Sequence, residues 1–206
     1  MKPLFITAIG TDIGKTIVSA ILVEKLQADY WKPIQSGDLE NSDTMKVKQL
    51  VSNDHSVFHP ESYRLTQPFS PHKSADLDGI KIDINNIKIP ETSNQLIIEG
   101  AGGLMVPLNE THYVIDLVHH FDVDVILVVK HYLGSINHTL LSLEALKARN
   151  VKVRGIIFNG AVDDYSESAI SNYHNIPIIG HINALAKLSK ETIKSEGKRL
   201  NISITS

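Results

Sequence analysis

The stretch IGTDIGKTIVSA, which begins at Ile9, contains residue types suited to binding phosphate. Gly10 and Gly14 allow the backbone to curl so that successive N–H groups point inward as an anion-binding nest. Lys15 supplies a full positive charge, and the hydroxyl of Thr16 is a ligand type for Mg²⁺. The spacing departs from the usual pattern G-x-x-x-x-G-K-[ST], because Ile9 stands at its first glycine. We predict a variant phosphate-binding loop; the alternative is a strand-to-helix turn with a Thr cap.

Further charged residues stand where other predicted elements begin or end. Lys32 and Ser36 lie in WKPIQSG, Asp43 lies in NSD, and Glu99 ends an apolar run that precedes Gly100-Ala101-Gly102. An acidic residue at such a strand end holds Mg²⁺ in P-loop proteins, and glycines let a ligand approach the backbone. For Lys32 and Glu99 the alternative is a solvated charge. For Asp43 alone, a simple helix N-cap is the favoured interpretation.

Alternating strands and helices are predicted to position these residues. Strands are expected at 3–8, 30–34 (cut by a proline), 95–100, 124–130, 152–159 and 176–182, with helices at 15–28, 43–52, 113–121, 135–150 and 166–175. The strands show no alternation of polar and apolar residues, so both faces of the sheet should be covered. The pattern predicts one α/β domain over residues 1–206, a parallel sheet with helices on both faces. Region 76–94 stays open between a short helix and a loop.

Composition narrows the function classes. The chain has 206 residues, of which 42% are hydrophobic and 21% are charged, and its net charge of −3 predicts no nucleic-acid partner. It contains no cysteine, which excludes disulfides, thiolate metal sites and a Cys nucleophile. No apolar run approaches the roughly 18 residues of a membrane span, and the N-terminus does not read as a signal peptide. We therefore expect a cytoplasmic protein without a membrane association.

Taken together, the motifs resemble those of one enzyme family. TDIGKT, WKPIQSG, NSD, SPH, IIEGAGGLMVPL and LGSINHTLLS occur here in the order and roughly the spacing of dethiobiotin synthetases. The similarity runs from residue 3 to about residue 185, and the combination is far more specific than any single motif. The resemblance implies a P-loop NTPase-like fold and a homodimer whose active site lies at the interface. It also implies an ATP-dependent reaction of 7,8-diaminononanoate with CO₂ through a carbamate and a carbamic–phosphoric anhydride.

The resemblance also assigns expected roles to residues. Lys15 and Lys32 are the expected catalytic residues, since a carbamate and a triphosphate repel each other unless cations intervene. Mg²⁺ is expected on Thr16, Asp43 and Glu99. The substrate residues are expected to be Thr11, Lys32, Ser36, Ser135 and Asn137, the last two contributed by the partner subunit to the carboxylate tail. The ATP-binding residues are expected to be Asp12, Ile13, Gly14, Lys15, Thr16, Ile17, Glu99, Gly100, Ala101, Gly102, Asn159, Gly160, Asn183, Ala184 and Leu185.

Three departures and three rival functions accompany this interpretation. Asp12 replaces a commoner Glu, Ala8 replaces a frequent Gly, and Asn183 replaces a frequent Pro. The change at Asn183 leaves open the shape of the 181–185 loop and the selectivity for ATP.

A partition-type ATPase usually has an additional lysine in its phosphate-binding loop, and that lysine is absent here. A cobyrinate-type amidotransferase needs a Cys nucleophile. A non-catalytic nucleotide-binding module does not account for Lys32, Asp43 and Glu99. The partition-type ATPase remains the principal alternative.

Overall fold

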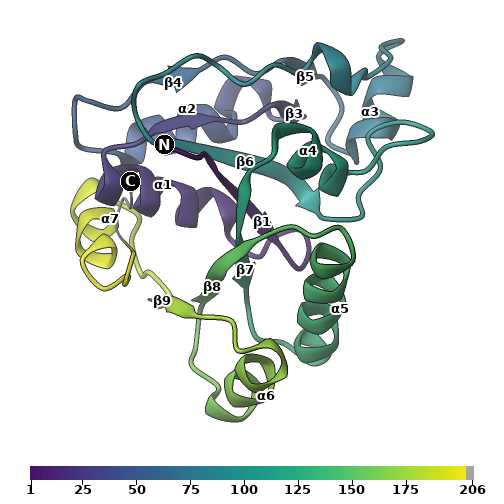
Figure 1. The fold of residues 1–206 in the computed structure, drawn as a ribbon. Helices are drawn as coiled ribbons and strands as arrows, with labels where there is room; N and C mark the ends of the chain where they lie inside the picture. The colour runs from purple at the N-terminus through teal and green to yellow at the C-terminus, as the bar shows by residue number, and fades with distance from the viewer. Residues whose placement is uncertain (203–206) are drawn as a thin grey trace.

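Seven strands form one parallel sheet in the order β4-β2-β6-β1-β7-β8-β9 (Figure 1). The computed structural model describes residues 1–202. The strands are β1 (Leu4–Ala8), β2 (Asp29–Trp31), β4 (Phe58–His59), β6 (Leu96–Gly103), β7 (Asp124–Val129), β8 (Val153–Asn159) and β9 (Ile178–Ile182). The central strand β1 lies between β6 and β7, so the loop that follows it emerges from the middle of the sheet. The predicted parallel sheet is confirmed.

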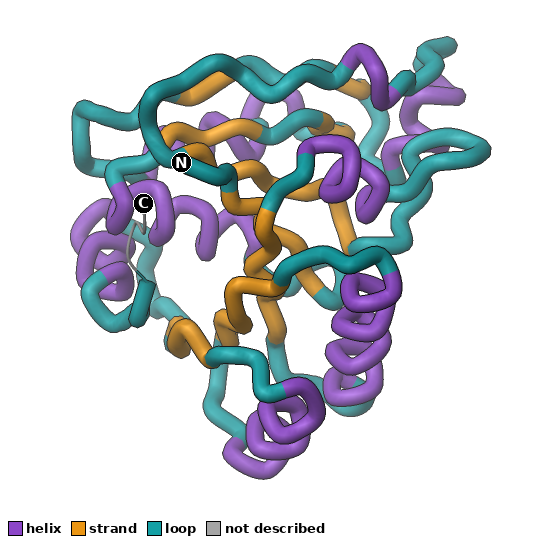
Figure 2. Tube along the Cα trace, viewed as in Figure 1, coloured by secondary structure: helices purple, strands orange, loops and turns teal. Residues whose placement is uncertain are grey.

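Helices cover both faces of the sheet, as predicted (Figure 2). One face packs against α1 (Lys15–Leu26), α2 (Asp43–Leu50) and α7 (Lys190–Gly197), and the other against α4 (Val114–Phe121), α5 (Ser135–Ala148) and α6 (Asp164–His174). Consecutive strand residues point to opposite faces. Phe5 and Ile6 therefore enter different core clusters, and both are fully buried. Within residues 1–202, no helix combines the length and apolarity needed to cross a bilayer.

The predicted strand at 30–34 is wrong as one element. Of this segment, only β2 belongs to the main sheet. Ile34 begins β3 (Ile34–Ser36), which pairs in parallel with β5 (Tyr63–Leu65) in a separate two-stranded sheet. Pro33 lies between the two strands and has no N–H to donate to a ladder. Its carbonyl accepts from the N–H groups of Ser62 and Tyr63. This break places Lys32 between two sheets, at the carboxyl edge of β2.

Several short elements have too little apolar periodicity to be found in the sequence. They are η1 (Leu39–Asn41), β4, β5, α3 (Pro71–Leu77), η2 (Ile84–Asn86) and α7. The open region 76–94 contains the end of α3 and η2, with loops between them. Its three buried isoleucines, Ile82, Ile84 and Ile87, pack in the same core cluster as Trp31. Tertiary packing therefore orders a segment whose local pattern is ambiguous.

Candidate active site

The loop between β1 and α1 turns tightly before the first turn of the helix. Asp12 and Gly14 have positive φ angles of 59° and 99°, and Gly14 caps α1 without a side-chain hydrogen bond. The first N–H groups of α1 therefore face no side-chain acceptor, which is the arrangement that binds phosphate at helix N-termini. Lys15 Nζ donates to the carbonyl oxygen of Gly10 at 3.1 Å, so its ammonium folds back over the loop.

Lys15 carries its charge in a poorly solvated position. Burial lowers the pKa of the Lys15 ammonium to about 8, although the nearby Glu99 carboxylate acts to raise it. An opposite charge within a few ångströms favours the charged form of a lysine. A triphosphate at the loop would therefore stabilise the Lys15 ammonium, and the ammonium would in turn offset the charge of the phosphate.

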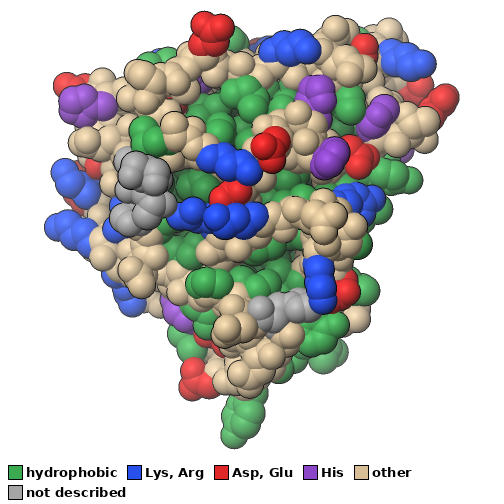
Figure 3. Space-filling view, in the orientation of Figure 1, with side chains coloured by type: hydrophobic (Ala, Val, Ile, Leu, Met, Phe, Trp, Pro, Cys, Tyr) green, Lys and Arg blue, Asp and Glu red, His purple; other side chains and the backbone are tan. Residues whose placement is uncertain are grey.

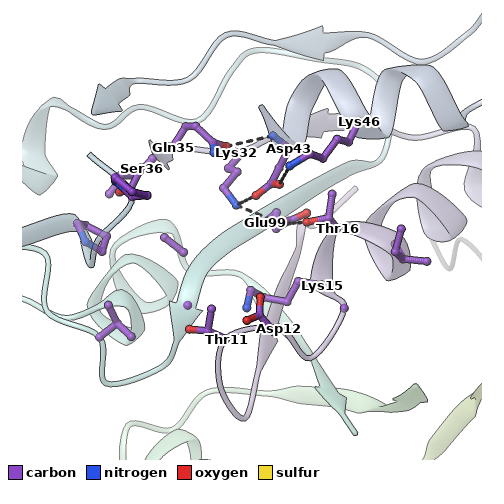
Figure 4. A pocket seen from close by; sticks show the side chains of 18 of the residues that line it. Thr11, Asp12, Lys15, Thr16, Lys32, Gln35, Ser36, Asp43, Lys46 and Glu99 are labelled. Atoms are coloured by element: carbon purple, nitrogen blue, oxygen red, sulfur yellow. Dashed lines mark hydrogen bonds and ion pairs between the residues drawn. The ribbon is translucent and has the colours of Figure 1, made fainter. Parts of the chain in front are cut away.

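Lys32 lies between two carboxylates (Figure 4). Its Nζ contacts Asp43 Oδ2 and lies 3.2 Å from Glu99 Oε1. The exposed fractions of the Lys32 and Glu99 side chains are only 7% and 1%. Burial would lower the pKa of Lys32, yet Glu99 and Asp43 raise it overall. Lys32 therefore keeps its proton, because losing it would leave two desolvated carboxylates without a cation.

Asp43 is the first residue of α2 and not its N-cap, so the capping interpretation is wrong. Ser42 is the N-cap and accepts from the N–H of Met45. The Asp43 carboxylate is consequently directed at Lys32, and its second oxygen lies 3.5 Å from Lys46 Nζ. Burial would raise the pKa of Asp43, but Lys32 outweighs it and the pKa is lowered. Asp43 is thus an ionised carboxylate facing the site.

The oxygen atoms gathered here fit a hard divalent cation. Thr16 Oγ1 donates to Glu99 Oε1 at 2.9 Å, and Asp43 and Glu99 are bridged by the Lys32 ammonium. Carboxylate and hydroxyl oxygens are the protein ligands that Mg²⁺ prefers, and in nucleotide sites it keeps several waters. A cation already lies between the two carboxylates in the form of Lys32. Thr16, Asp43 and Glu99 therefore lie close together, and their binding of Mg²⁺ stays a prediction.

A cleft of about 900 Å³ opens over this cluster. Thr11, Asp12, Ile17 and Ser36 line it, as do Ala101 and Gly102. Ser36 Oγ is buried and has no hydrogen-bond partner among the described residues. The cleft is also lined by residues to which the sequence analysis assigned no role: Ile34, Gln35, Lys46, Gln49, Leu50, Pro68, Phe69, Ser70, Pro71, Val106 and Leu188. The face of the molecule drawn in Figure 3 intermixes basic and acidic side chains.

Gly100 and Ile13 have packing roles instead of facing the cleft. A Cβ at Gly100 would lie 2.8 Å from the Phe5 ring, so only glycine fits without displacement of that ring. Ile13 is 5% exposed and belongs to the core cluster beneath α1. Both residues nevertheless present their backbone close to the site.

The residues predicted to bind the adenine base are half-buried or exposed. Asn159 Nδ2 donates to the carbonyl oxygen of Ile13 at 2.7 Å, which ties the end of β8 to the phosphate loop. Gly160 follows with a φ of 116°. Asn183 and Ala184 are exposed, and Leu185 is half-buried against the core.

Asn183 is directed toward Arg199, near the end of the described chain. With its amide oriented to face the guanidinium, Asn183 accepts at 2.7 and 3.1 Å. The sequence offered no signal for this contact, because the two residues lie in different loops.

Ser135 and Asn137 do not line the cleft of a single chain. Ser135 is buried at the start of α5, where its N–H donates to the carbonyl oxygen of Tyr132, and Asn137 is exposed. Around them, Leu133 and Leu141 are exposed apolar side chains. These two residues therefore do not join Thr11, Lys32 and Ser36, the other predicted substrate residues, in the cleft of one chain.

The fold is shared with solved ATPases. A ParA family ATPase from Chlorobium tepidum TLS matches with a TM-score of 0.59 at 13% identity, covering 97% of this chain and 100% of that one. The cell division ATPase MinD of Pyrococcus furiosus matches with a TM-score of 0.58 at 12% identity, covering 96% and 89%. At such low identity the likeness shows the fold alone, and it confirms the P-loop NTPase-like architecture.

Sequence relatives identify the family to which the chain belongs. A family model described as an AAA domain matches residues 2–192. The ATP-dependent dethiobiotin synthetase BioD of Christiangramia forsetii is 58% identical over 181 residues, covering 88% of this chain and 87% of that protein. The protein of the same name from Cytophaga hutchinsonii is 49% identical, covering 97% of each chain. The resemblance found in the motifs is confirmed: the chain belongs to the family of ATP-dependent dethiobiotin synthetases, the enzymes of biotin biosynthesis.

Proposed function

We propose that this chain joins CO₂ to 7,8-diaminononanoate and closes a ureido ring, consuming ATP in the presence of Mg²⁺. The observation that carries the proposal is the convergence of Lys15, Lys32, Asp43 and Glu99 on one cleft. Identities of 58% and 49%, over 88% and 97% of the chain, to proteins named ATP-dependent dethiobiotin synthetase support it. The proposed unit of function is a single domain spanning residues 1–206.

The reaction proceeds in three steps. One amine of the diamine adds to CO₂ and loses a proton, which gives a carbamate. A carbamate oxygen attacks the γ-phosphorus of ATP. The bond between the γ-phosphorus and the oxygen that bridges it to the β-phosphorus breaks, and ADP leaves. The second amine then attacks the carbonyl carbon of this carbamic–phosphoric anhydride and expels phosphate. The carbamate is already an oxyanion, so the phosphoryl transfer step requires no strong general base.

Lys15 and Lys32 offset the repulsion between the two reacting anions. At an effective dielectric of about 20, two unit charges 4 Å apart repel by about 4 kcal/mol. Lys15 holds the phosphate end, and Lys32, beyond β2, faces the carbamate. Because both ammonium groups are buried, water screens their charges less than it would at the surface. Thr11 and Ser36 bind the diamine and its carbamate from the lining of the cleft.

Thr16, Asp43 and Glu99 hold Mg²⁺ in this proposal. When bound, the ion neutralises charge on the β- and γ-phosphate oxygens. The cluster is suited to this role because the Lys32 ammonium holds the Asp43 and Glu99 carboxylates close together. Asp12, Gly14, Ile17 and the 100–102 backbone surround the phosphates and ribose.

Asn159, Gly160, Asn183, Ala184 and Leu185 receive the adenine in this proposal. The Asn159 contact to Ile13 supports it, because it keeps the end of β8 next to the phosphate loop.

The active form is a homodimer that shares its sites. Ser135 and Asn137 lie outside the cleft of their own chain, while Leu133, Ile136 and Leu141 expose apolar surface beside them. A second copy would bury this surface and bring the N-terminal end of α5, with its partial positive charge, to the carboxylate tail of the diamine.

A subunit-mixing experiment tests this arrangement. One variant carries Lys15→Ala, and the other carries both Ser135→Ala and Asn137→Ala. Random reassortment of equal amounts of the two chains should restore about a quarter of the sites. No restoration above the separate variants would contradict a shared site.

The function is tested by measuring phosphate release from ATP with Mg²⁺ and bicarbonate, with and without 7,8-diaminononanoate, while mass spectrometry follows the organic product. Release that depends on the diamine, with a product heavier by CO₂ minus water, is expected. ATP turnover indifferent to the diamine would instead favour the partition-type ATPase. The assignment of the protein to the cytoplasm and the expectation that it binds no nucleic acid remain predictions from composition.

A further inference from the structure

Tyr30 places a hydroxyl group inside the core directly behind Glu99. The residue is fully buried, and its ring packs at a tilted angle against Phe58, with ring centroids 6.3 Å apart. Its hydroxyl donates to Glu99 Oε2 at 3.0 Å. Burial raises the pKa of the Tyr30 phenol well above its usual value, with Glu99 contributing in the same direction. The phenol therefore remains a neutral hydrogen-bond donor at physiological pH.

The two oxygens of Glu99 have different partners. Oε1 accepts from Thr16 Oγ1 at 2.9 Å and lies 3.2 Å from Lys32 Nζ, whereas Oε2 faces Tyr30. A carboxylate that accepts on both sides cannot rotate about its terminal torsion without losing a hydrogen bond. Leaving a buried acceptor unsatisfied costs about 1–3 kcal/mol. The Tyr30 hydrogen bond therefore holds Oε1 toward the cleft and Oε2 toward the core.

The topology of the sheet explains why Tyr30 can reach this carboxylate. Strands β2 and β6 are adjacent and parallel, with Tyr30 opposite Ile97. Side chains two residues apart on a strand share a face, so Tyr30 and Lys32 approach the end of β6 from one side. Glu99 follows two residues after Ile97 and lies within reach of both. A tyrosine at this position of β2 is thus able to orient a residue that is 69 positions away in the sequence.

We propose that Tyr30 is a positioning residue for the reaction: its hydroxyl orients the Glu99 carboxylate so that Oε1 is presented to Thr16 and to the cation and phosphates of the substrate. This inference rests on the proposed function of Glu99. Hydrogen-bond partners behind a metal-binding carboxylate typically contribute about 10- to 100-fold to metal affinity or activity. A purely structural tyrosine would contribute through its ring, which phenylalanine retains.

The test compares Tyr30→Phe with the matched control Tyr63→Phe. Tyr63 also uses its hydroxyl, which accepts from the N–H of Asp83 and donates to its carbonyl, and it lies in the two-stranded sheet. The apparent Kd of Mn²⁺ is measured by electron paramagnetic resonance with the protein and a non-hydrolysable ATP analogue. We expect Tyr30→Phe to raise this Kd by about 10-fold and to lower kcat, while KM for the diamine stays unchanged. Tyr63→Phe should change none of these.

A double-mutant cycle with Glu99→Gln shows whether Tyr30 acts through Glu99. In the Glu99→Gln background, Tyr30→Phe should have no further effect on Mn²⁺ binding. Unchanged Mn²⁺ affinity and kcat in a folded Tyr30→Phe protein, or full additivity in the cycle, would overturn the proposal. Mn²⁺ binding is measured without the diamine, so a wild-type protein that binds Mn²⁺ but lacks diamine-dependent turnover would refute the proposed function separately.

A measurement that leaves Tyr30 in place covers the case in which Tyr30→Phe does not fold. The ¹³C resonance of the Tyr30 ζ-carbon reports the hydrogen bond of the phenol. It should shift in Glu99→Gln, where the charged acceptor is replaced by an amide, and on addition of Mg²⁺ and ADP to the wild type. The absence of both shifts would overturn the proposal.

Discussion

The two ends of the proposed nucleotide site are built in different ways. At the phosphate end, Lys15, Lys32 and Glu99 are buried, and ion pairs and hydrogen bonds connect Lys32 and Glu99 to their neighbours. At the base end, Asn183 and Ala184 are exposed. Charges that stabilise a transition state must be oriented before the reaction, because reorienting them costs free energy. Binding of the adenine base needs only a contact surface and a few hydrogen bonds. The base end of the site can therefore be exposed and can accommodate different residues.

The largest expected effect is at the phosphate end. Lys15→Ala or Lys32→Met should lower kcat at least about 100-fold, because each removes a buried cation from the proposed site of phosphoryl transfer. The measurement is steady-state dethiobiotin formation, with thermal unfolding as a check on the fold. Lys48→Ala, at an exposed position of α2, is the matched control and should retain normal turnover. Near-normal turnover of the Lys32 variant would remove that residue from the mechanism.

The next largest effect probes the contact between the two ends. A Cβ at Gly14 would lie 2.1 Å from Asn159 Nδ2, and the Gly14 φ of 99° disfavours other residues. Gly14→Ala should therefore raise KM for ATP by about 10-fold or more, by strain and by displacement of Asn159. In an Asn159→Ala background the steric part should disappear and only the backbone strain remain. Equal effects of Gly14→Ala in both backgrounds would mean that the two ends are independent.

A change of about 1 kcal/mol in the free energy of unfolding is expected away from both ends, where α1 contacts the loop that follows α2. Glu24 accepts from the N–H and hydroxyl of Ser52. Burial would raise the pKa of Glu24, but these hydrogen bonds lower it below its ordinary value of 4.5. Its contribution to stability is therefore present above pH 4.5 and is lost as the pH falls through the lower, folded-state pKa.

Glu24→Gln should lower the free energy of unfolding at pH 7, and the difference from wild type should shrink as the pH falls below 4.5. Urea unfolding at a series of pH values measures it. A difference that is constant with pH would show that the charge of Glu24 is not responsible.

The smallest effect is expected at the exposed base loop. Asn183→Ala should change KM for ATP by about threefold or less, because the side chain is solvated and its hydrogen bonds to Arg199 are at the surface. Competition between ATP and GTP measures the nucleotide selectivity of the Asn183→Ala variant. A loss as large as that of Lys15→Ala would abolish the distinction between the two ends.

Much of the fold could be predicted from local patterns. Apolar runs without alternation predicted a parallel sheet covered on both faces, since strands buried on both sides need no polar side chains on either face. The glycines, Lys15 and Thr16 indicated the phosphate loop, because a nest followed by a helix N-terminus needs only adjacent residues. The short elements α3, β4 and β5 escaped prediction, because their few apolar residues are ordered by tertiary contacts.

By itself, the sequence determined the parallel α/β architecture, the phosphate loop and the family, because these depend on residue type and local spacing. Only the tertiary structure decided the break after β2 that presents Lys32, the choice of Ser42 as the cap that leaves Asp43 for the site, and the contact of Tyr30 with Glu99. The choice between Ser42 and Asp43 as the cap depends on the residue at which α2 begins, which sequence patterns locate only to within one or two positions. The break after β2 and the Tyr30–Glu99 contact join residues on different elements. Their distances depend on how strands are ordered in the sheet, which no local pattern records.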